Sequence, residues 1–244
     1  SPVTGAVSYD VAADEPDGDH SEFTDFRSPA FTAIKMTGTG VFGWRVRDGF
    51  IRPRLIDLQG GLRDHQRLFR RLSVFAGGCM LDAASVVAGE GEAEAEAIGR
   101  VFTLIDHSLL LREELRGGDV RVRMLEVIRE YGAERLEAHG EAEATRHAHA
   151  AWYLTMAAAA RAQIEGPQRR SAHRRIRHDL GNLRAALSWL LASGDAEGAH
   201  RLANEMARFW IDLGYISEGR RWLEQVAGLP DPVSPGARAE ALYW

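Results

Sequence analysis

The chain of 244 residues contains one cysteine, one lysine and no apolar run long enough to cross a bilayer. Cys79 has no second cysteine to pair with, so an intrachain disulfide is excluded and a reducing compartment is expected. A transmembrane helix needs about 20 consecutive apolar residues, and no such stretch is present. The first 24 residues carry no lysine or arginine and no apolar core, unlike a secretory signal peptide. We therefore expect a cytoplasmic protein.

The scarcity of lysine also bears on nucleotide chemistry. A P-loop ends in Lys followed by Ser or Thr, because the lysine contacts the β- and γ-phosphates and the hydroxyl binds magnesium. Lys35 is followed by Met36, so this motif is absent from the sequence. Gly38, Gly40 and Gly43 have the spacing of a dinucleotide-binding loop, but the residues after them do not continue as a long helix. We interpret them as a glycine-rich loop and expect no bound cofactor.

The residues that carry chemistry do not form a recognisable catalytic or metal-binding set. His147 and His149 would point to different faces of a helix, and Glu143 adds only one ligand to His147. His173 and His178 lie among arginines, which disfavour a divalent cation. The net charge of -5 gives no general attraction to nucleic acid or anionic membranes. The sequence favours a protein that is not an enzyme and holds no metal.

Three segments differ in pattern. Residues 1–61 begin acidic and then become glycine-rich without a helical period, so we expect an irregular or poorly ordered segment. Val41–Val46 is a candidate strand within it. Whether this segment is native or the product of a truncation or frameshift is open. Residues 62–140 and 141–244 are strongly periodic and are expected to form two further domains.

The pattern of residues 62–140 predicts a winged-helix-like domain. Apolar residues share one helical face over 68–75, before a Gly-Gly stop, and two more helices are predicted over 81–88 and 98–105. β-rich runs then flank the glycines at 117–118, as in a hairpin, and a fourth helix follows. Three helices followed by a hairpin is the winged-helix order.

The pattern of residues 141–244 is helical throughout. Asp195 is positioned to cap one helix, and Gly194 and Gly214 to end two. The stretch 210–214 matches the opening W-x2-L-G of the tetratricopeptide pattern. The predicted fold class is therefore mainly α, a winged-helix-like domain followed by a partial tetratricopeptide-like α-solenoid. The last predicted helix is short and apolar at its end, so we expect a solenoid truncated at the C-terminus.

Four sequence blocks carry a resemblance to a known family. They read L-F-R-R-L-S-V-F-A-G-G at Leu68–Gly78, R-M-L-E-V-I-R-E-Y at Arg123–Tyr131, N-L-R-A-A-L-S-W at Asn182–Trp189 and S-E-G-R-R-W-L-E at Ser217–Glu224. The segment resembles the region C-terminal to the ATPase in bacterial LuxR-type and related STAND transcriptional regulators. This resemblance implies a winged-helix joint and a tetratricopeptide-like sensor arm that holds the motor inactive until an inducer binds. The family's phosphate-binding motif and output helix-turn-helix are absent from this sequence.

The sequence thus predicts a signal-sensing and protein-interaction fragment of a STAND regulator that lacks its ATPase motor. The expected partners are a protein or the missing ATPase domain, with a small-molecule or peptide inducer, DNA only indirectly and no membrane. Leu68, Phe69 and Phe75 are expected to anchor the joint. The residues expected to line a ligand or partner groove are Trp210, Tyr215, Arg220, Arg221 and Trp222.

Two alternatives stay open. A DNA-binding winged helix would use Arg112, Arg121 and Arg123 on the hairpin to contact phosphates. The third predicted helix opens with Glu92, Glu94 and Glu96, which places negative charge where phosphate would lie. The arginine-rich stretch 169–177 either docks an acidic partner or nucleotide phosphate, or is a solvated helix face, which we favour.

Overall fold

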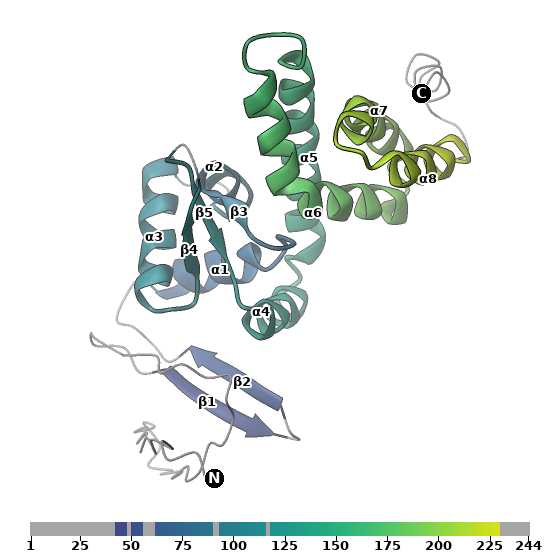
Figure 1. The fold of residues 1–244 in the computed structure, drawn as a ribbon. Coiled ribbons are helices and arrows are strands. Elements are labelled where there is room, and N and C mark those ends of the chain that lie inside the picture. The colour runs from purple at the N-terminus through teal and green to yellow at the C-terminus, as the bar shows by residue number, and fades with distance from the viewer. Residues whose placement is uncertain (1–41, 48–49, 56–61, 90–92, 116–117, 230–244) are drawn as a thin grey trace, which may run out of the picture. The chain divides into compact units, whose positions relative to one another are not determined.

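The computed structural model describes residues 42–47, 50–55, 62–89, 93–115 and 118–229 (Figure 1). The chain divides into two compact units, residues 1–66 and 67–244. In the first unit, β1 (Phe42–Arg47) pairs antiparallel with β2 (Phe50–Leu55). The candidate strand at 41–46 therefore corresponds closely to β1, while most of the segment expected to be irregular lies outside the described residues. Because Gly43 is in a strand, the glycine pattern is not followed by the helix that a dinucleotide site requires.

Helix α1 (Leu62–Leu72) runs into the second unit, where the winged-helix elements follow one another. These are β3 (Cys79–Met80), α2 (Leu81–Ala83) with its π-helical extension η1 (Ala84–Ala88), α3 (Glu94–Asp106), β4 (Leu111–Glu114) and β5 (Val120–Arg123). The sheet has the order β3-β5-β4 and both pairs are antiparallel. The hairpin is thus the expected one, and β3 is an additional strand on the far side of β5.

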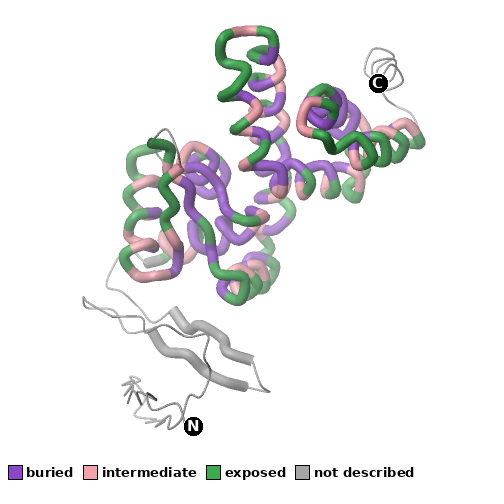
Figure 2. Tube along the Cα trace, viewed as in Figure 1, coloured by how far each residue is buried: buried purple, intermediate pink, exposed green. Residues whose placement is uncertain are grey.

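The core of this domain forms because apolar residues recur on one face of each element. Leu68, Phe69 and Phe75 are buried at 1–2% exposure, and Val101 of α3 and Val122 of β5 are buried with them. Figure 2 shows that the outer face of α3 is exposed. Removing these side chains from water is the main stabilising contribution of the domain.

Five helices follow the winged helix in the described part of the chain. They are α4 (Glu126–Ala138), α5 (Ala142–Ala162), α6 (Arg169–Ser193), α7 (Ala196–Asp212) and α8 (Ile216–Ala227). Helix α5 packs against α6 and α7, and α7 packs against α8 (Figure 1). We refer to α5–α8 as the arm. The Asp195 carboxylate accepts the Gly198 amide at 2.9 Å, as expected for the cap of α7.

The predicted fold class is confirmed at the level of a mainly helical protein with a winged helix followed by packed helices. The finer reading of the arm as tetratricopeptide-like repeats stays a prediction. Within the described ranges, no helix is both long and apolar enough to span a membrane.

Candidate functional site at the winged-helix joint

The turn between α1 and β3 brings the backbone of the winged helix close to its own sheet. Gly77 and Gly78 both have positive φ, +78° and +91°, which favours glycine. A Cβ atom on Gly78 would lie 2.4 Å from the Val122 carbonyl oxygen of β5. The turn therefore fits against β5 only because residue 78 has no side chain.

Arg121 of β5 is buried beside this turn. Its side chain is 7% exposed, and Nη1 donates to Oδ1 of Asp179 on α6 at 2.9 Å. Nη2 donates to the Gly78 carbonyl at 2.8 Å and to the Gly77 carbonyl at 3.2 Å. One guanidinium thus joins the glycine turn to the arm.

Asp179 is fully buried and gathers polar groups from three elements. Besides Arg121, its Oδ2 accepts Arg175 Nε at 2.9 Å, and its Oδ1 accepts the Tyr153 hydroxyl of α5 at 3.3 Å. Arg175 continues the chain of charges, since its two terminal nitrogens contact both oxygens of Asp82 at 3.0 Å. Two arginines and two aspartates alternate, so each buried charge faces an opposite one.

Asn182 lies about one helical turn after Asp179 on α6 and forms hydrogen bonds with the backbone of the glycine turn. Its Oδ1 accepts the Ala76 amide at 2.7 Å and its Nδ2 donates to the Gly78 carbonyl at 2.8 Å. His149 of α5 lies beside it, with Nε2 3.4 Å from the same Oδ1. Burial lowers the pKa of His149 to about 4, so the ring is neutral near pH 7.

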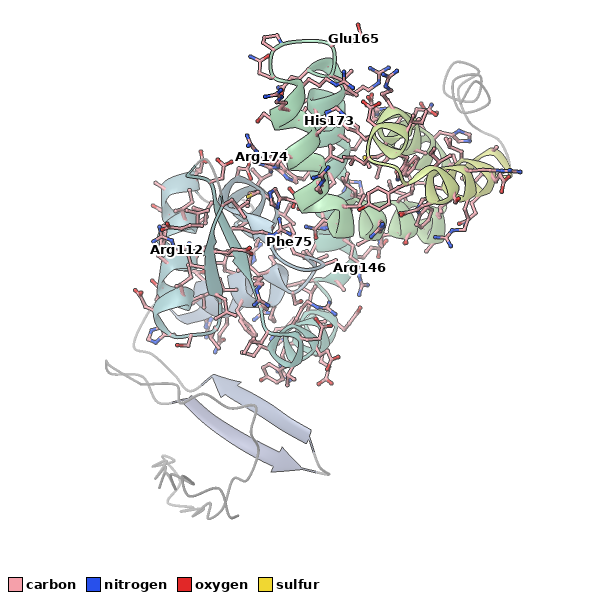
Figure 3. All side chains as sticks on the ribbon, in the orientation of Figure 1. Phe75, Arg112, Arg146, Glu165, His173 and Arg174 are labelled. Atoms are coloured by element: carbon pink, nitrogen blue, oxygen red, sulfur yellow. The ribbon has the colours of Figure 1, made fainter. Side chains whose placement is uncertain are left out.

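Aromatic packing closes the apolar side of this joint. Figure 3 labels Phe75 where the winged helix meets the arm. Its ring lies 5.3 Å from His149 and 6.3 Å from Tyr153, measured between centroids. The predicted anchor residue therefore packs directly against the side chains that hold Asp179 and Asn182.

A second contact ties α1 to the start of α5. Arg70 Nη2 lies 2.7 Å from Oε1 of Glu141, and Arg71 Nε lies 3.5 Å from Oε2. Burial alone would raise the pKa of Glu141, but the hydrogen bond from Arg70 and the neighbouring arginine charges outweigh it, and the pKa is lowered. The paired arginines of the first sequence block therefore hold the start of the arm, at the N-terminus of α5. We refer to these two contact regions together as the joint.

The joint offers no reactive group to solvent. Cys79 is buried, and burial raises the pKa of its thiol well above the usual value, which disfavours the nucleophilic thiolate. In the described part of the chain, no three His, Cys, Asp or Glu side chains are grouped so that they could hold a metal ion. The arrangement can couple a movement of the arm to a movement of the winged helix, because separating paired buried charges costs free energy.

The three arginines considered for DNA contact do not share a surface. Arg112 is exposed on β4 and pairs with Glu114 at 2.6 Å, and Arg123 is exposed on β5. Arg121 is instead buried, and its guanidinium is occupied by Asp179 and the glycine turn. As placed, it is not available to a phosphate group. Glu92 lies outside the described residues.

The five residues expected in a groove differ in their burial and contacts. Trp210 is 3% exposed and packs against Gly219 of α8, where a Cβ would come within 2.8 Å of it. Tyr215 lies beneath the Arg184 guanidinium at 5.7 Å, and the Trp222 Nε1 atom lies 3.3 Å from Glu218. The two remaining residues are exposed, one of them paired with Glu224 at 2.7 Å: Arg220 and Arg221. Tyr215 and Trp222 thus lie at the same Arg184–Glu218 pair, whereas Trp210 is buried.

The residues at the centre of the joint were not identified from sequence. Asp179 interrupts the buried stripe of α6, three residues after Ile176 and four before Leu183. A charged residue in an apolar helical stripe is the one sequence signal that points to a buried ion pair. Arg175, four residues earlier on α6, is a local partner, whereas Arg121 and Tyr153 lie on other elements and carry no local signal.

Comparisons with known proteins agree with the winged helix. Residues 63–137 match the family model of a winged helix-turn-helix domain. The chain is similar to a candidate HTH-type transcriptional regulator of Mycobacterium tuberculosis, 32% identical over 185 residues that cover 72% of this chain and 20% of the relative. A protein of Mycobacterium bovis with the same description matches equally.

A shorter similarity is to an uncharacterised protein of Mycobacterium tuberculosis, 38% identical over 79 residues that cover 32% of this chain and 20% of the relative. The chain thus spans about a fifth of the length of these relatives. No solved structure matches the chain. Residues 63–137 therefore form a winged helix-turn-helix domain, within a chain distantly homologous to a limited part of much longer regulator proteins.

Proposed function

We propose that the chain is a signal-sensing and protein-interaction part of a larger STAND-type transcriptional regulator, and that it is not an enzyme. In this proposal the winged helix connects the arm to a protein partner or to the ATPase domain. The observation that carries the proposal is the buried Arg121–Asp179 pair, which connects β5 of the winged helix to α6 of the arm. The similarity to longer candidate regulators supports the setting, and the four sequence blocks support the STAND class.

The packing of the arm supports its reading as tetratricopeptide-like. Helices α5 and α6 form one hairpin, α7 and α8 form the next, and α5 contacts α7 across them. Stacked helix pairs of this kind present an extended surface for a protein or peptide. A peptide or small-molecule inducer, rather than DNA, is the proposed ligand of this part of the chain.

The charge of α3 favours a winged helix that contacts protein over one that binds DNA. A recognition helix presents cations to phosphate and donors to base edges. The exposed acidic residues of α3 are Glu94, Glu96 and Asp106, and Arg100 is only half exposed. An approaching duplex would therefore meet net negative charge on this helix.

The experiment that separates the two functions is a titration of the whole chain into fluorescently labelled duplex DNA at low salt. If the winged helix does not bind DNA, we expect no saturable binding in the micromolar range, because non-specific protein–DNA complexes have dissociation constants of about 1–100 μM. Micromolar binding that weakens with salt and is lost in the R112A/R123A double variant would contradict the proposal. Arg220→Ala is the matched control, because it removes an exposed arginine distant in sequence from the wing.

A further inference from the structure

A small hollow lies at the end of the arm where α5 gives way to α6. It has a volume of about 130 Å³ and is lined by Arg161, Ile164, Glu165, Arg169 and Arg208. The three arginines come from α5, α6 and α7, so the hollow exists only because these helices pack together. Figure 3 labels Glu165 at this end of the arm.

Asp212 holds two of these arginines in place. Arg169 Nη2 lies 3.2 Å from its Oδ2, and Arg208 Nε lies 3.0 Å from its Oδ1. His173 Nε2 also contacts Oδ2, at 2.9 Å. Burial would raise the pKa of Asp212, but the hydrogen bond with His173 and the charges of Arg208 and Arg169 outweigh it, so the pKa is lowered. One ionised carboxylate therefore orients two guanidinium groups without neutralising both.

The cations at the hollow retain unused hydrogen-bonding capacity. The side chains of Arg169 and Arg208 are 55% and 44% exposed, and each guanidinium has five N–H donors. Within the described residues, the Arg161 side chain forms no ion pair or hydrogen bond. Glu165 is the one acidic residue that lines the hollow, so cations outnumber it.

The size and chemistry of the hollow define what it fits. The hollow is small, on the scale of a few waters or one tetrahedral oxyanion. Guanidinium forks match phosphate oxygens in geometry and charge. Ile164 is 5% exposed and forms an apolar wall beside the cations.

We propose that Arg161, Arg169 and Arg208 form a binding site for the phosphate group of a small phosphorylated molecule. This assigns a ligand class to the arm and rests on the proposed sensing function only for its biological meaning. Of the arginine-rich stretch 169–177, Arg169 contributes directly, while Arg175 belongs to the joint. Glu165 weakens the site by repulsion, so its removal strengthens binding.

The test is calorimetric titration of the whole chain with inorganic phosphate, glycerol 3-phosphate and acetate at matched ionic strength. We expect saturable binding of both phosphate probes at about millimolar affinity and weaker binding of acetate. Arg161→Gln and Arg208→Gln each lower the phosphate affinity about tenfold through the loss of a charge-assisted hydrogen bond. Glu165→Gln raises it severalfold.

Arg174→Gln is the matched control, since Arg174 is an exposed arginine of α6, the helix that supplies Arg169, and does not line the hollow. Figure 3 labels its side chain. It is expected to leave the phosphate affinity unchanged. No saturable binding of either phosphate probe, or equal losses in the Arg161 and Arg174 variants, would overturn the site. If phosphate binds as expected while the chain also binds DNA tightly, the site stands and the proposed function fails.

Discussion

At the scale of single residues, the joint depends on where a side chain is missing as much as on where one is present. Gly78 allows the turn to approach β5, and Asn182 then satisfies the polar backbone groups of that turn at 2.7 and 2.8 Å. Unpaired backbone groups in this buried position would each be costly. Gly78 and Asn182, which carry no charge, thus fix the turn whose carbonyl groups accept hydrogen bonds from Arg121.

Gly78→Ala is expected to destabilise the protein by more than about 3 kcal/mol, because its Cβ would clash with a backbone oxygen and the φ of +91° is strained for alanine. Gly77→Ala is the matched control. It has a similar φ of +78° but open space around its Cβ, so about 1 kcal/mol is expected. Urea denaturation measures both values. Equal losses would show that the close approach to β5 is absent.

His149 is expected to make stability depend on pH. The unfolded ring binds a proton below about pH 6.5, whereas burial lowers the pKa of the folded ring to about 4. Protonation therefore favours the unfolded chain, and stability falls as the pH is lowered from 6.5 to 4. The full contribution is about 3 kcal/mol, with no further loss below pH 4.

Urea denaturation of the native protein and of His149→Gln, at pH 7.5 and pH 4.5, measures this contribution. Carboxylates such as Glu141 and Asp212 titrate in both proteins, so the difference between the proteins isolates His149. The native protein is expected to lose about 2–3 kcal/mol more than the variant between these pH values. Parallel losses in both proteins would mean that His149 is exposed to solvent.

Among the helices and strands, the sequence predicted the features that depend on residues close together in the chain. The face shared by Leu68, Phe69 and Phe75, the hairpin of β4 and β5, and the Asp195 cap all follow from residues close in sequence. Strand β3 was not predicted, because it has two residues and forms only where the Gly78 turn places it beside β5. Such a strand depends on tertiary contact alone.

Buried charges were the main feature that periodicity did not identify. A pattern of apolar positions assigns charged residues to the surface, as it did for Arg121. Asp179 lies 58 residues away in sequence, and Asp82 lies 93 residues from Arg175. The Arg175–Asp179 pair is local to α6, but the partners on other elements, which complete the burial of these charges, are not contained in any local window.

At the level of the whole fold, the four sequence blocks contact one another. Asn182 of the third block bonds Ala76 of the first, and Arg129 of the second lies 3.5 Å from the Ser73 carbonyl of the first. Arg184 of the third block pairs with Glu218 of the fourth at 2.6 Å. The blocks are thus the sequence trace of the interfaces that connect the winged helix, α6 and α8.

Buried charges hold the winged helix against the arm, and a double-mutant cycle on Arg121 and Asp179 measures their contribution. The unfolding free energies of R121A, D179A and the double variant are compared with that of the native chain. We expect a coupling energy of at least about 2 kcal/mol, because D179A leaves the buried Arg121 without a carboxylate and R121A leaves Asp179 with Arg175 as its one cationic partner among the described residues. The exposed Arg112–Glu114 pair, 45% and 71% exposed, serves as the control and is expected to couple by less than about 0.5 kcal/mol. A coupling between Arg121 and Asp179 as small as that of the control pair would contradict the account.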